Sequence, residues 1–346
     1  MRLIPFFAIL LTILVLVPAT AVLAHSPVFP EENHSPSTAY EISDPDKSWA
    51  IYTALEHEGV DYYRFTRVSG EKIQISLIVP ESPSDSGFLP SFALLGPSLT
   101  PDGHLIEHIE VPYGYGSITV NSSDPWQAIY EPFTPSWFYE VGSLTISAAE
   151  DGTYYIAVFD PVQHNDIHSH THQDAKYAII VGYLEAFTPL ELVLIPYSVQ
   201  EIYSWEGQNQ FIIFLPMILV LVVGGVILYW RRRQGKNPNG ISKWLAAVGG
   251  LAFLGSALGT IYQMCLALNA SGLTVEAVIT LTVAAISIVL GFITLRYALR
   301  NKPDLTIPRR VGLIISGVIA LFLWSGFYLG PALVIVSALM PRSTAE

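Results

Sequence analysis

Four histidines lie within nine residues of one another near the middle of the chain, in the stretch QHNDIHSHTHQD over residues 163–174. They are His164, His168, His170 and His172. The last three alternate, and alternate side chains of an extended segment project from one face. Imidazole suits copper, zinc and nickel, and Asp166 and Asp174 add oxygen donors. We therefore predict a transition-metal site, copper before zinc; the alternative is a solvated acidic loop whose histidines titrate near neutral pH.

A fifth histidine, His25, could become a metal ligand through the expected cleavage of a signal peptide. Arg2 precedes an apolar run over residues 3–16, and Pro18 and small residues follow, which is the layout of a secretory signal. Cleavage after Ala21 and cleavage after Ala24 both fit, and an uncleaved anchor is the alternative. Cleavage after Ala24 makes His25 the first mature residue, so its α-amino group, with a pKa of about 8, and its imidazole can chelate one copper ion.

An N-terminal histidine together with an HxH pair resembles the histidine brace of copper-binding periplasmic proteins, lytic polysaccharide monooxygenases and the exported subunit of particulate methane monooxygenase. The matching residues are His25 and either His168 with His170 or His170 with His172. The surrounding chain does not match. The resemblance implies a copper site on a β-sandwich, and cleavage after Ala21 would remove it.

The remaining histidines suggest less chemistry. His104 and His108 would lie one turn apart on a helix, but the neighbouring turn residues leave barely two turns, so surface positions are the preferred interpretation. His34 and His57 have no partner in the sequence and are taken as surface residues. The sequence has no GxSxG elbow, no HExxH helix and no cysteine outside a predicted membrane helix, so no hydrolase is indicated.

Charge is concentrated in the N-terminal half. Residues 25–210 carry 26 Asp and Glu against five Lys and Arg, a formal charge of −21. Phosphate binding needs clustered cationic side chains, so this charge argues against a nucleic-acid partner. It favours cations, high-salt surroundings or simple solubility. The only cysteine, Cys265, lies in a predicted membrane helix, so this half must fold without an intramolecular disulfide.

The C-terminal half predicts four transmembrane helices, over residues 211–230, 244–268, 275–295 and 311–339. Each is long enough for about 30 Å of hydrocarbon. Ten Lys and Arg follow the first and third segments, which places those loops in the cytoplasm, and the N-terminal domain and the C-terminus outside. No ionisable group lies mid-membrane, which argues against a transporter.

Small and polar residues in the second membrane segment are interpreted as structural. Gly255 and Gly259 form a small-xxx-small pattern typical of close helix packing. Gln263, Met264 and Cys265 include soft metal ligands, but adjacent residues point in different directions around a helix. We expect them to make lipid and helix contacts.

Between residues 45 and 185 the hydrophobic period is two. Ile73, Ile75, Leu77 and Val79 share one face, and similar runs occur at residues 49–55, 60–66, 92–96, 143–147, 152–159 and 176–183. Short strands without a helical period indicate an antiparallel all-β sandwich. The succession DYYRFTRVSGEKIQISLIVP, SFALLGP, DGTYYIAVFD and KYAIIVGY, over residues 61–183, resembles the bacterial pre-peptidase C-terminal domain. That resemblance implies a jelly-roll-like, non-catalytic binding module; a Pro-, Tyr- and Trp-rich insertion and the histidine segment depart from it.

The expected organisation is a signal peptide (1–24), an exported β-sandwich (25–185), a juxtamembrane connector (186–210) and a four-helix transmembrane domain (211–340). In the connector, Pro189 and Pro196 are expected to prevent one regular helix. Three functions remain open: a surface metal-handling protein in the cell membrane; a display module that recognises a glycan, a peptide or a neighbouring membrane protein through the aromatic insertion 113–139; and an oxidative copper enzyme. A second copy of the chain is a further expected partner, as a homo-oligomer.

Overall fold

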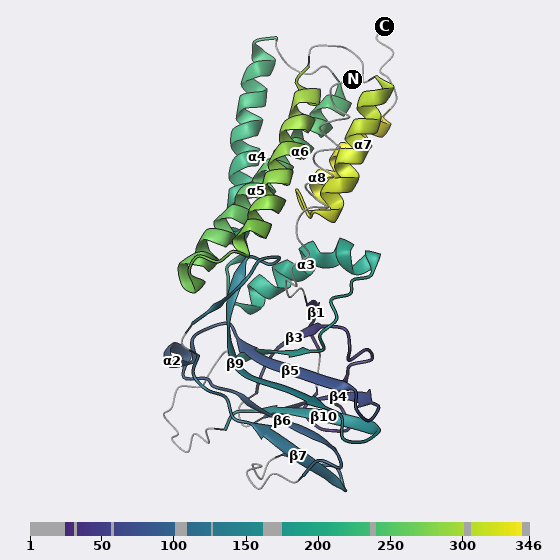
Figure 1. Cartoon of the computed structure of the whole chain (residues 1–346). Helices are drawn as coiled ribbons and strands as arrows, with labels where there is room; N and C mark the ends of the chain where they lie inside the picture. Colours follow the sequence, from purple (N-terminus) through teal and green to yellow (C-terminus); the bar gives the residue numbers. More distant parts are fainter. Residues whose placement is uncertain are drawn as a thin grey trace.

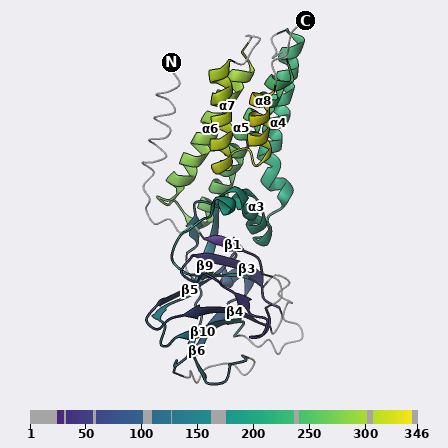
Figure 2. The same cartoon turned by 90° about the vertical axis from the view of Figure 1, so that its right-hand side faces the viewer.

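The computed structural model describes residues 25–30, 33–56, 59–100, 109–125, 127–161, 175–235, 240–300 and 306–340. The predicted signal peptide, His57, His104, His108 and the four clustered histidines lie outside these residues. Figures 1 and 2 show a bundle of helices, a helix lying across its end, and two β-sheets.

The two sheets form a sandwich. One has six strands in the order β1-β3-β11-β5-β9-β8, with bounds Ser26–Val28, Trp49–Ala54, Lys176–Val181, Lys72–Val79, Ser136–Ser147 and Ile129–Glu131. The other has five, β2-β4-β10-β6-β7, with bounds Tyr40–Glu41, Val60–Arg67, Gly152–Phe159, Ser91–Pro97 and Tyr115–Val120. A short helix, α2 (Pro83–Ser86), follows β5.

The alternation of apolar and polar residues along the strands defines the core as predicted. Ile73, Ile75, Leu77 and Val79 are all buried in the cluster between the sheets. Alternate residues on the other face of the six-stranded sheet are also buried, among them Ala50, Ala178 and Ile180. This sheet is therefore covered on both faces.

The prediction of a purely antiparallel sandwich is wrong at two edges. β1 runs parallel to β3, and β2 runs parallel to β4. A parallel neighbour requires a long connection, and residues 29–48, which link β1 to β3, supply one.

The expectation that two prolines break the connector is also wrong. Helix α3 (Pro189–Trp205) is continuous: Thr188 caps it, Glu191 completes a capping box and Pro189 takes the first turn, where proline is tolerated. Pro196 has no N–H to offer the carbonyl of Leu192 four residues earlier. That carbonyl instead accepts a 3.0 Å hydrogen bond from the Trp324 indole N–H.

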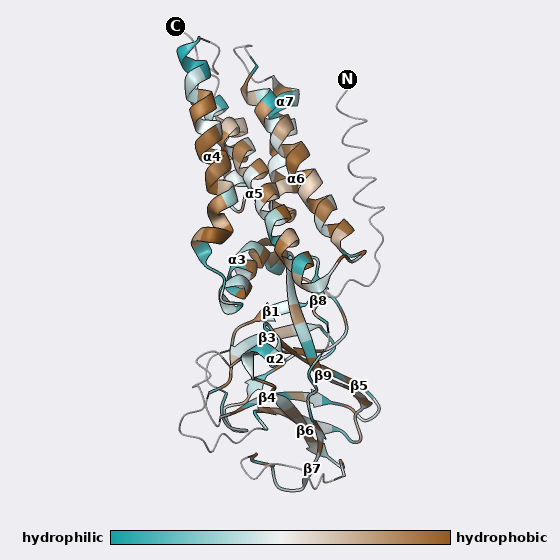
Figure 3. Ribbon diagram, turned by 90° about the vertical axis from the view of Figure 1, so that its left-hand side faces the viewer, coloured by the Kyte–Doolittle hydropathy of each residue, from teal (hydrophilic) through white to brown (hydrophobic). Residues whose placement is uncertain are grey.

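Among the described residues, three helices are long and apolar enough to cross a membrane: α4 (Gln210–Arg233), α5 (Ile241–Ser271) and α6 (Ala277–Ala298). Their middles are hydrophobic, and hydrophilic residues gather at the end far from the sheets (Figure 3). The fourth predicted helix is not one span. It is broken into α7 (Ile307–Phe322) and α8 (Leu329–Leu339), which pack side by side (Figure 2).

The backbone between α7 and α8 explains the break. Trp324, Gly326 and Phe327 all have positive φ, at 56°, 74° and 55°, which no continuing helix allows. A Cβ at Gly326 would stand 2.7 Å from the Phe253 ring, so glycine is required there for packing as well.

The two helices form a hairpin that returns to its starting side. Arg310, in the first turn of α7, donates hydrogen bonds of 3.0 and 2.6 Å to the carbonyls of Ala338 and Met340 at the end of α8. Met340 therefore lies at the end of the bundle where α7 begins. The prediction that the C-terminus leaves the bundle on the side of the sandwich is wrong at this residue.

Single cysteines in a Cys265→Ser background test this hairpin. Gln234→Cys and Met340→Cys should react with a membrane-impermeant maleimide from the same side of the membrane, because a hairpin returns the chain to where it entered. Leu273→Cys, at a position 93% exposed between α5 and α6, should react from the other side. Four complete spans would instead pair Met340→Cys with Leu273→Cys.

Candidate functional site at the membrane boundary

The predicted aromatic insertion docks on the chain's own membrane helices. Tyr130 of β8 lies 2.7 Å from the Thr280 hydroxyl of α6, which in turn donates a 2.7 Å hydrogen bond to the carbonyl of Pro132. Gln127 donates to the carbonyl of Ser271 at the end of α5, at 3.2 Å. The β8–β9 hairpin thus joins the sandwich to the ends of α5 and α6, and this part of the insertion is not free for a partner.

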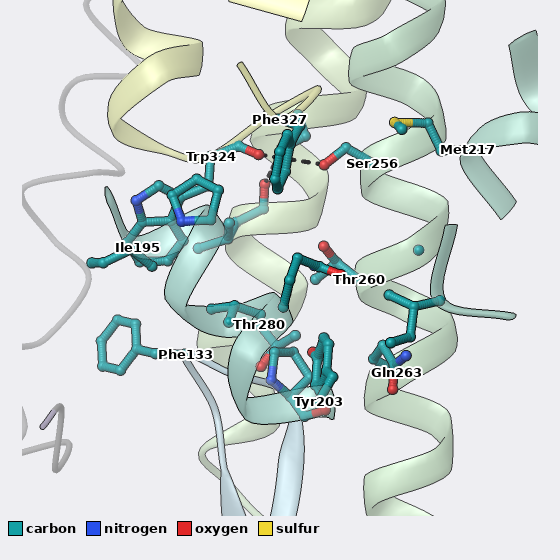
Figure 4. Close-up of a pocket in the computed structure, with 18 of the residues that line it drawn as sticks. Phe133, Ile195, Tyr203, Met217, Ser256, Thr260, Gln263, Thr280, Trp324 and Phe327 are labelled. Atoms are coloured by element: carbon teal, nitrogen blue, oxygen red, sulfur yellow. Dashed lines mark hydrogen bonds between the residues drawn. The ribbon is translucent and has the colours of Figure 1, made fainter. Parts of the chain in front are cut away.

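A cavity that is open to its surroundings lies beside this junction; we call it the boundary cavity (Figure 4). Its walls come from the hairpin turn, α3, α4, α5, α6 and the α7–α8 link. Apolar residues such as Phe133, Ile195, Met217 and Phe327 form much of the lining, with the hydroxyls of Ser256, Thr260, Thr280 and Ser287 between them. Such a lining, apolar with a few polar groups, is typical of small-molecule sites.

Two amide oxygens in the lining have no hydrogen-bond partner, Oε1 of Gln200 and Oε1 of Gln263. Gln263 is 3% exposed. Its orientation follows from a chain of hydrogen bonds: Gln208 Nε2 donates to the Glu206 carboxylate at 2.8 Å, so Gln208 Oε1 accepts from Gln263 Nε2, at 3.0 Å. Gln263 Oε1 is therefore turned away from Gln208 and is buried without a hydrogen-bond partner among the described residues.

A second cavity adjoins the first on the side of the sandwich; we call it the side cavity. Four residues line both: Phe133, Ile195, Val199 and Trp324. The side cavity adds the titratable residues His25, Tyr52, Glu131 and Glu185.

Burial shifts these groups towards their neutral forms. It lowers the pKa of His25 to about 4, so this imidazole is neutral at physiological pH. It raises the pKa of Glu131 to about 8, with a smaller contribution from the charge of Glu185, although the amide of Phe133 donates to the carboxylate at 3.0 Å. Burial likewise raises the pKa of Glu206 to about 7.

Of the predicted metal ligands, only His25 is among the described residues. Its Nδ1 lies 2.6 Å from the hydroxyl of Ser48, and that nitrogen is the one an N-terminal chelate would use. Within the described ranges no three His, Cys, Asp or Glu side chains gather closely enough to hold a metal.

The sheet register separates His25 from the ends of the histidine segment. Ser26 pairs with Trp49 at one end of β3, whereas Ala175, which follows the segment, bonds to Leu55 beyond the other end. The chain leaves β10 for the histidine segment at that same far end, where Phe159, the last residue of β10, pairs with Val60. A site that joins His25 to the cluster would require the segment to cover the length of β3.

One histidine taken as a surface residue has a buried partner. His34 Nδ1 lies 2.9 Å from Asp61 Oδ1, and Tyr177 donates to Asp61 Oδ2 at 2.6 Å. Tyr63 completes the chain, 2.6 Å from the Tyr177 hydroxyl. We interpret this network as structural, since it satisfies a fully buried carboxylate inside the sandwich.

Sequence reasoning did not single out Gln200, Glu131 or the cavity-facing role of Gln263. Only Gln263 left a signal, a lone amide in an apolar membrane segment. Its neighbours behave as expected: Met264 packs in an apolar cluster, and Cys265 is exposed.

No family model and no curated protein matches the chain. Solved structures are only weakly similar. The pre-peptidase C-terminal domain of a Bacillus anthracis collagenase has 16% identity and a TM-score of 0.22, over 43% of this chain and 94% of its own. The Salmonella Typhimurium periplasmic lysozyme inhibitor PliG has 12% identity and a TM-score of 0.21, over 46% and 98%.

The copper-binding secreted protein MopE of Methylococcus capsulatus has 11% identity and a TM-score of 0.20, over 46% of this chain and 99% of its own. The family that the strand succession resembles is thus present among the neighbours. At these scores the likeness is one of fold alone and weak.

The Glu131 carboxyl predicts a pH-dependent stability. Its folded pKa of about 8 lies above its ordinary 4.5, so its contribution is fully present below pH 4.5 and is lost as pH rises through 8. Glu131→Gln removes that loss. The melting temperature of the variant minus that of the wild type should therefore increase as pH rises from 4.5 to 8, in thermal unfolding of the full chain. Glu140→Gln, at an exposed position on β9, is the control; equal pH profiles for wild type and Glu131→Gln would contradict the assignment.

Proposed function

We propose that the chain is a membrane-anchored extracytoplasmic binding protein whose ligand is an amphiphile held in the boundary cavity. The observation that carries this proposal is an apolar cavity between the sandwich and the apolar helices, lined in part by two glutamines whose buried amide oxygens are unpaired. Burying a polar group without a hydrogen bond costs free energy, and a ligand donor would remove that cost.

The position of the cavity selects the kind of ligand. α4 and α6 contribute lining residues from their sandwich-side ends, and α5 contributes residues from its middle to its sandwich-side half. α3, the hairpin turn and the α7–α8 link contribute the rest. An apolar chain can therefore lie against Met217 and Phe214 while polar atoms reach Gln200 and Gln263. A water-soluble ligand would leave the apolar lining uncovered.

The charge pattern supports the orientation that this proposal needs. Arg231, Arg232 and Arg233 end α4, and Arg309 and Arg310 begin α7, all at the end of the bundle away from the sheets. Because Lys and Arg prefer cytoplasmic loops, this charge pattern supports an outside location for the acidic sandwich and the cavity.

Filling the cavity should abolish binding. A Cβ at Gly259, which lines the cavity, meets no atom within 4 Å, so Gly259→Leu fills the space without a clash of its own Cβ. Hexadecylamine bound to the purified full chain, counted by native mass spectrometry, should fall at least tenfold in this variant.

Gly225→Leu is the matched control, since Gly225 of α4 is equally open around its Cβ and lines neither cavity. It should bind as the wild type does. Equal binding by Gly259→Leu and Gly225→Leu would contradict the proposed site.

A second candidate is transition-metal binding by His25, His164, His168, His170 and His172. One observation favours it: the lowered pKa of His25 keeps its imidazole unprotonated, which metal ligation requires. The Ser48 contact engages Nδ1, so a brace would have to displace Ser48, whereas Nε2 can ligate without that change.

Cu(II) titration tests this candidate on the full chain after N-terminal sequencing of the mature protein. His168→Ala/His170→Ala/His172→Ala should weaken binding at least tenfold if the cluster holds the metal, and binding should fall as pH drops through the imidazole range near 6.5. Equal binding by wild type and variant would leave the cluster as a solvated segment.

A further inference from the structure

We infer that an anionic phospholipid binds between α6 and α7, at the end of the bundle away from the sheets, where Arg296, Arg300 and Arg309 hold its phosphate. This inference is independent of the proposed function, because it concerns the opposite end of the helix bundle.

The three arginines come from two helices and act on one place. Arg296 lies in the last turn of α6, Arg300 follows just beyond the end of that helix, and Arg309 lies in the first turn of α7. The charges of Arg309, Arg300 and Arg296 all act on the hydroxyl of Tyr297. Tyr297 is 7% exposed and lies against α7, since a Cβ at Gly312 would stand 3.4 Å from its hydroxyl oxygen. Three guanidinium groups therefore gather where α6 meets α7.

These three charges have no acidic partner in the part of the chain that the structure describes. Between residues 210 and 340 the only described Asp or Glu is Glu276, which precedes α6 at the end near the sandwich. Asp304, in the link between α6 and α7, lies outside the described residues. Like charges that lie close together repel. An anion among the arginines removes this repulsion, and guanidinium groups bind phosphate oxygens through paired N–H donors.

The start of α7 adds further positive character. The first N–H groups of a helix carry a partial positive charge, which favours anions and disfavours cations. The first turn of α7 has no acidic residue, and its N-cap residue, Thr306, makes no side-chain cap. Arg310 is compensated by the carbonyls of Ala338 and Met340 at the end of α8. Within the described ranges the side chain of Arg309 has no such acceptor, so an anion at this point offsets both its charge and that of the helix end.

The surface of α6 selects a lipid rather than a free anion. Exposed apolar side chains recur at helical spacing at Val278, Leu281, Ala285 and Phe292, and Arg296 follows one turn after Phe292 on the same face. In a membrane this stripe faces the acyl chains. A headgroup held at Arg296 therefore lets an acyl chain lie along Phe292, which is 61% exposed. Basic sites between membrane helices are known to bind anionic lipid headgroups.

Two phospholipids with the same palmitoyl and oleoyl chains test the inference: phosphatidylglycerol, which is anionic, and phosphatidylcholine, which has no net charge. The purified full chain in dodecyl maltoside should bind phosphatidylglycerol at least tenfold more tightly than phosphatidylcholine, by native mass spectrometry. Inorganic phosphate in tenfold excess should not displace the lipid, because it has no acyl chain. Equal binding of the two lipids, or displacement by inorganic phosphate, would overturn the assignment.

Replacing the arginines should remove the preference. Arg296→Gln/Arg300→Gln/Arg309→Gln should lower the ratio of phosphatidylglycerol to phosphatidylcholine binding at least tenfold. Arg300→Gln alone lies beyond the end of α6, where no helix is disturbed, and should lower this ratio at least threefold. Unchanged phosphatidylcholine binding in both variants serves as the check that they are folded. A wild-type ratio in the folded triple variant would contradict the site.

Arg231→Gln/Arg232→Gln/Arg233→Gln is the matched control. It removes the same number of charges from the same end of the bundle, at the end of α4, and should keep the wild-type ratio. An equal loss in both triple variants would show a diffuse attraction to the whole end of the bundle and no site between α6 and α7. Asp304→Asn should also bind as the wild type does. A tenfold gain of phosphatidylglycerol binding in Asp304→Asn would instead show that this carboxylate occupies the place assigned to the lipid.

Discussion

The arrangement of the molecule depends on the hydrogen bond between the Trp324 indole and the carbonyl of Leu192. Pro196 frees that carbonyl, and an unpaired carbonyl in the first turn of α3 would be destabilising. The indole that satisfies it comes from the sharp link between α7 and α8, where positive φ angles turn the chain back. The hydrogen bond thus joins the proline-containing helix α3 to the link between α7 and α8. This contact holds α3 across the end of the bundle.

Once α3 is held there, both faces of the six-stranded sheet are buried. The inner face packs on the second sheet, while Ala50, Ala178 and Ile180 of the outer face lie in a cluster with the ring of Trp205 from the end of α3. Trp205 also donates to the carbonyl of Thr53, at 2.7 Å. The sandwich is therefore attached to the membrane domain on two sides, through α3 and through the β8–β9 hairpin. The two cavities lie between these attachments, where neither packing surface matches the other fully.

Local patterns predicted the strands well, because a strand with one buried face must alternate: β5 lies where Ile73, Ile75, Leu77 and Val79 placed it. They failed where a long-range contact decides the outcome. The hydropathy of residues 311–339 is uniform enough for one span, and only the close packing of Gly326 and Gly330 on Phe253 shows why the chain turns. Pro196 looked like a helix breaker because its compensating donor is Trp324, far along the sequence. Glu131 and Gln200 carry no local signal, since their surroundings come from distant segments.

The unpaired amide of Gln263 can be weighed against two ordinary explanations. A solvated surface amide is excluded because the residue is 3% exposed. A purely structural amide would use both ends, and here only Nε2 is used, because the Glu206 and Gln208 chain fixes its direction. Leucine at this position would pack against the apolar lining with no unpaired atom and would be expected to stabilise the helix bundle. The unpaired acceptor, buried where the sandwich meets the helix bundle, is therefore a cost that the fold retains, and it is the feature on which the proposed ligand site depends.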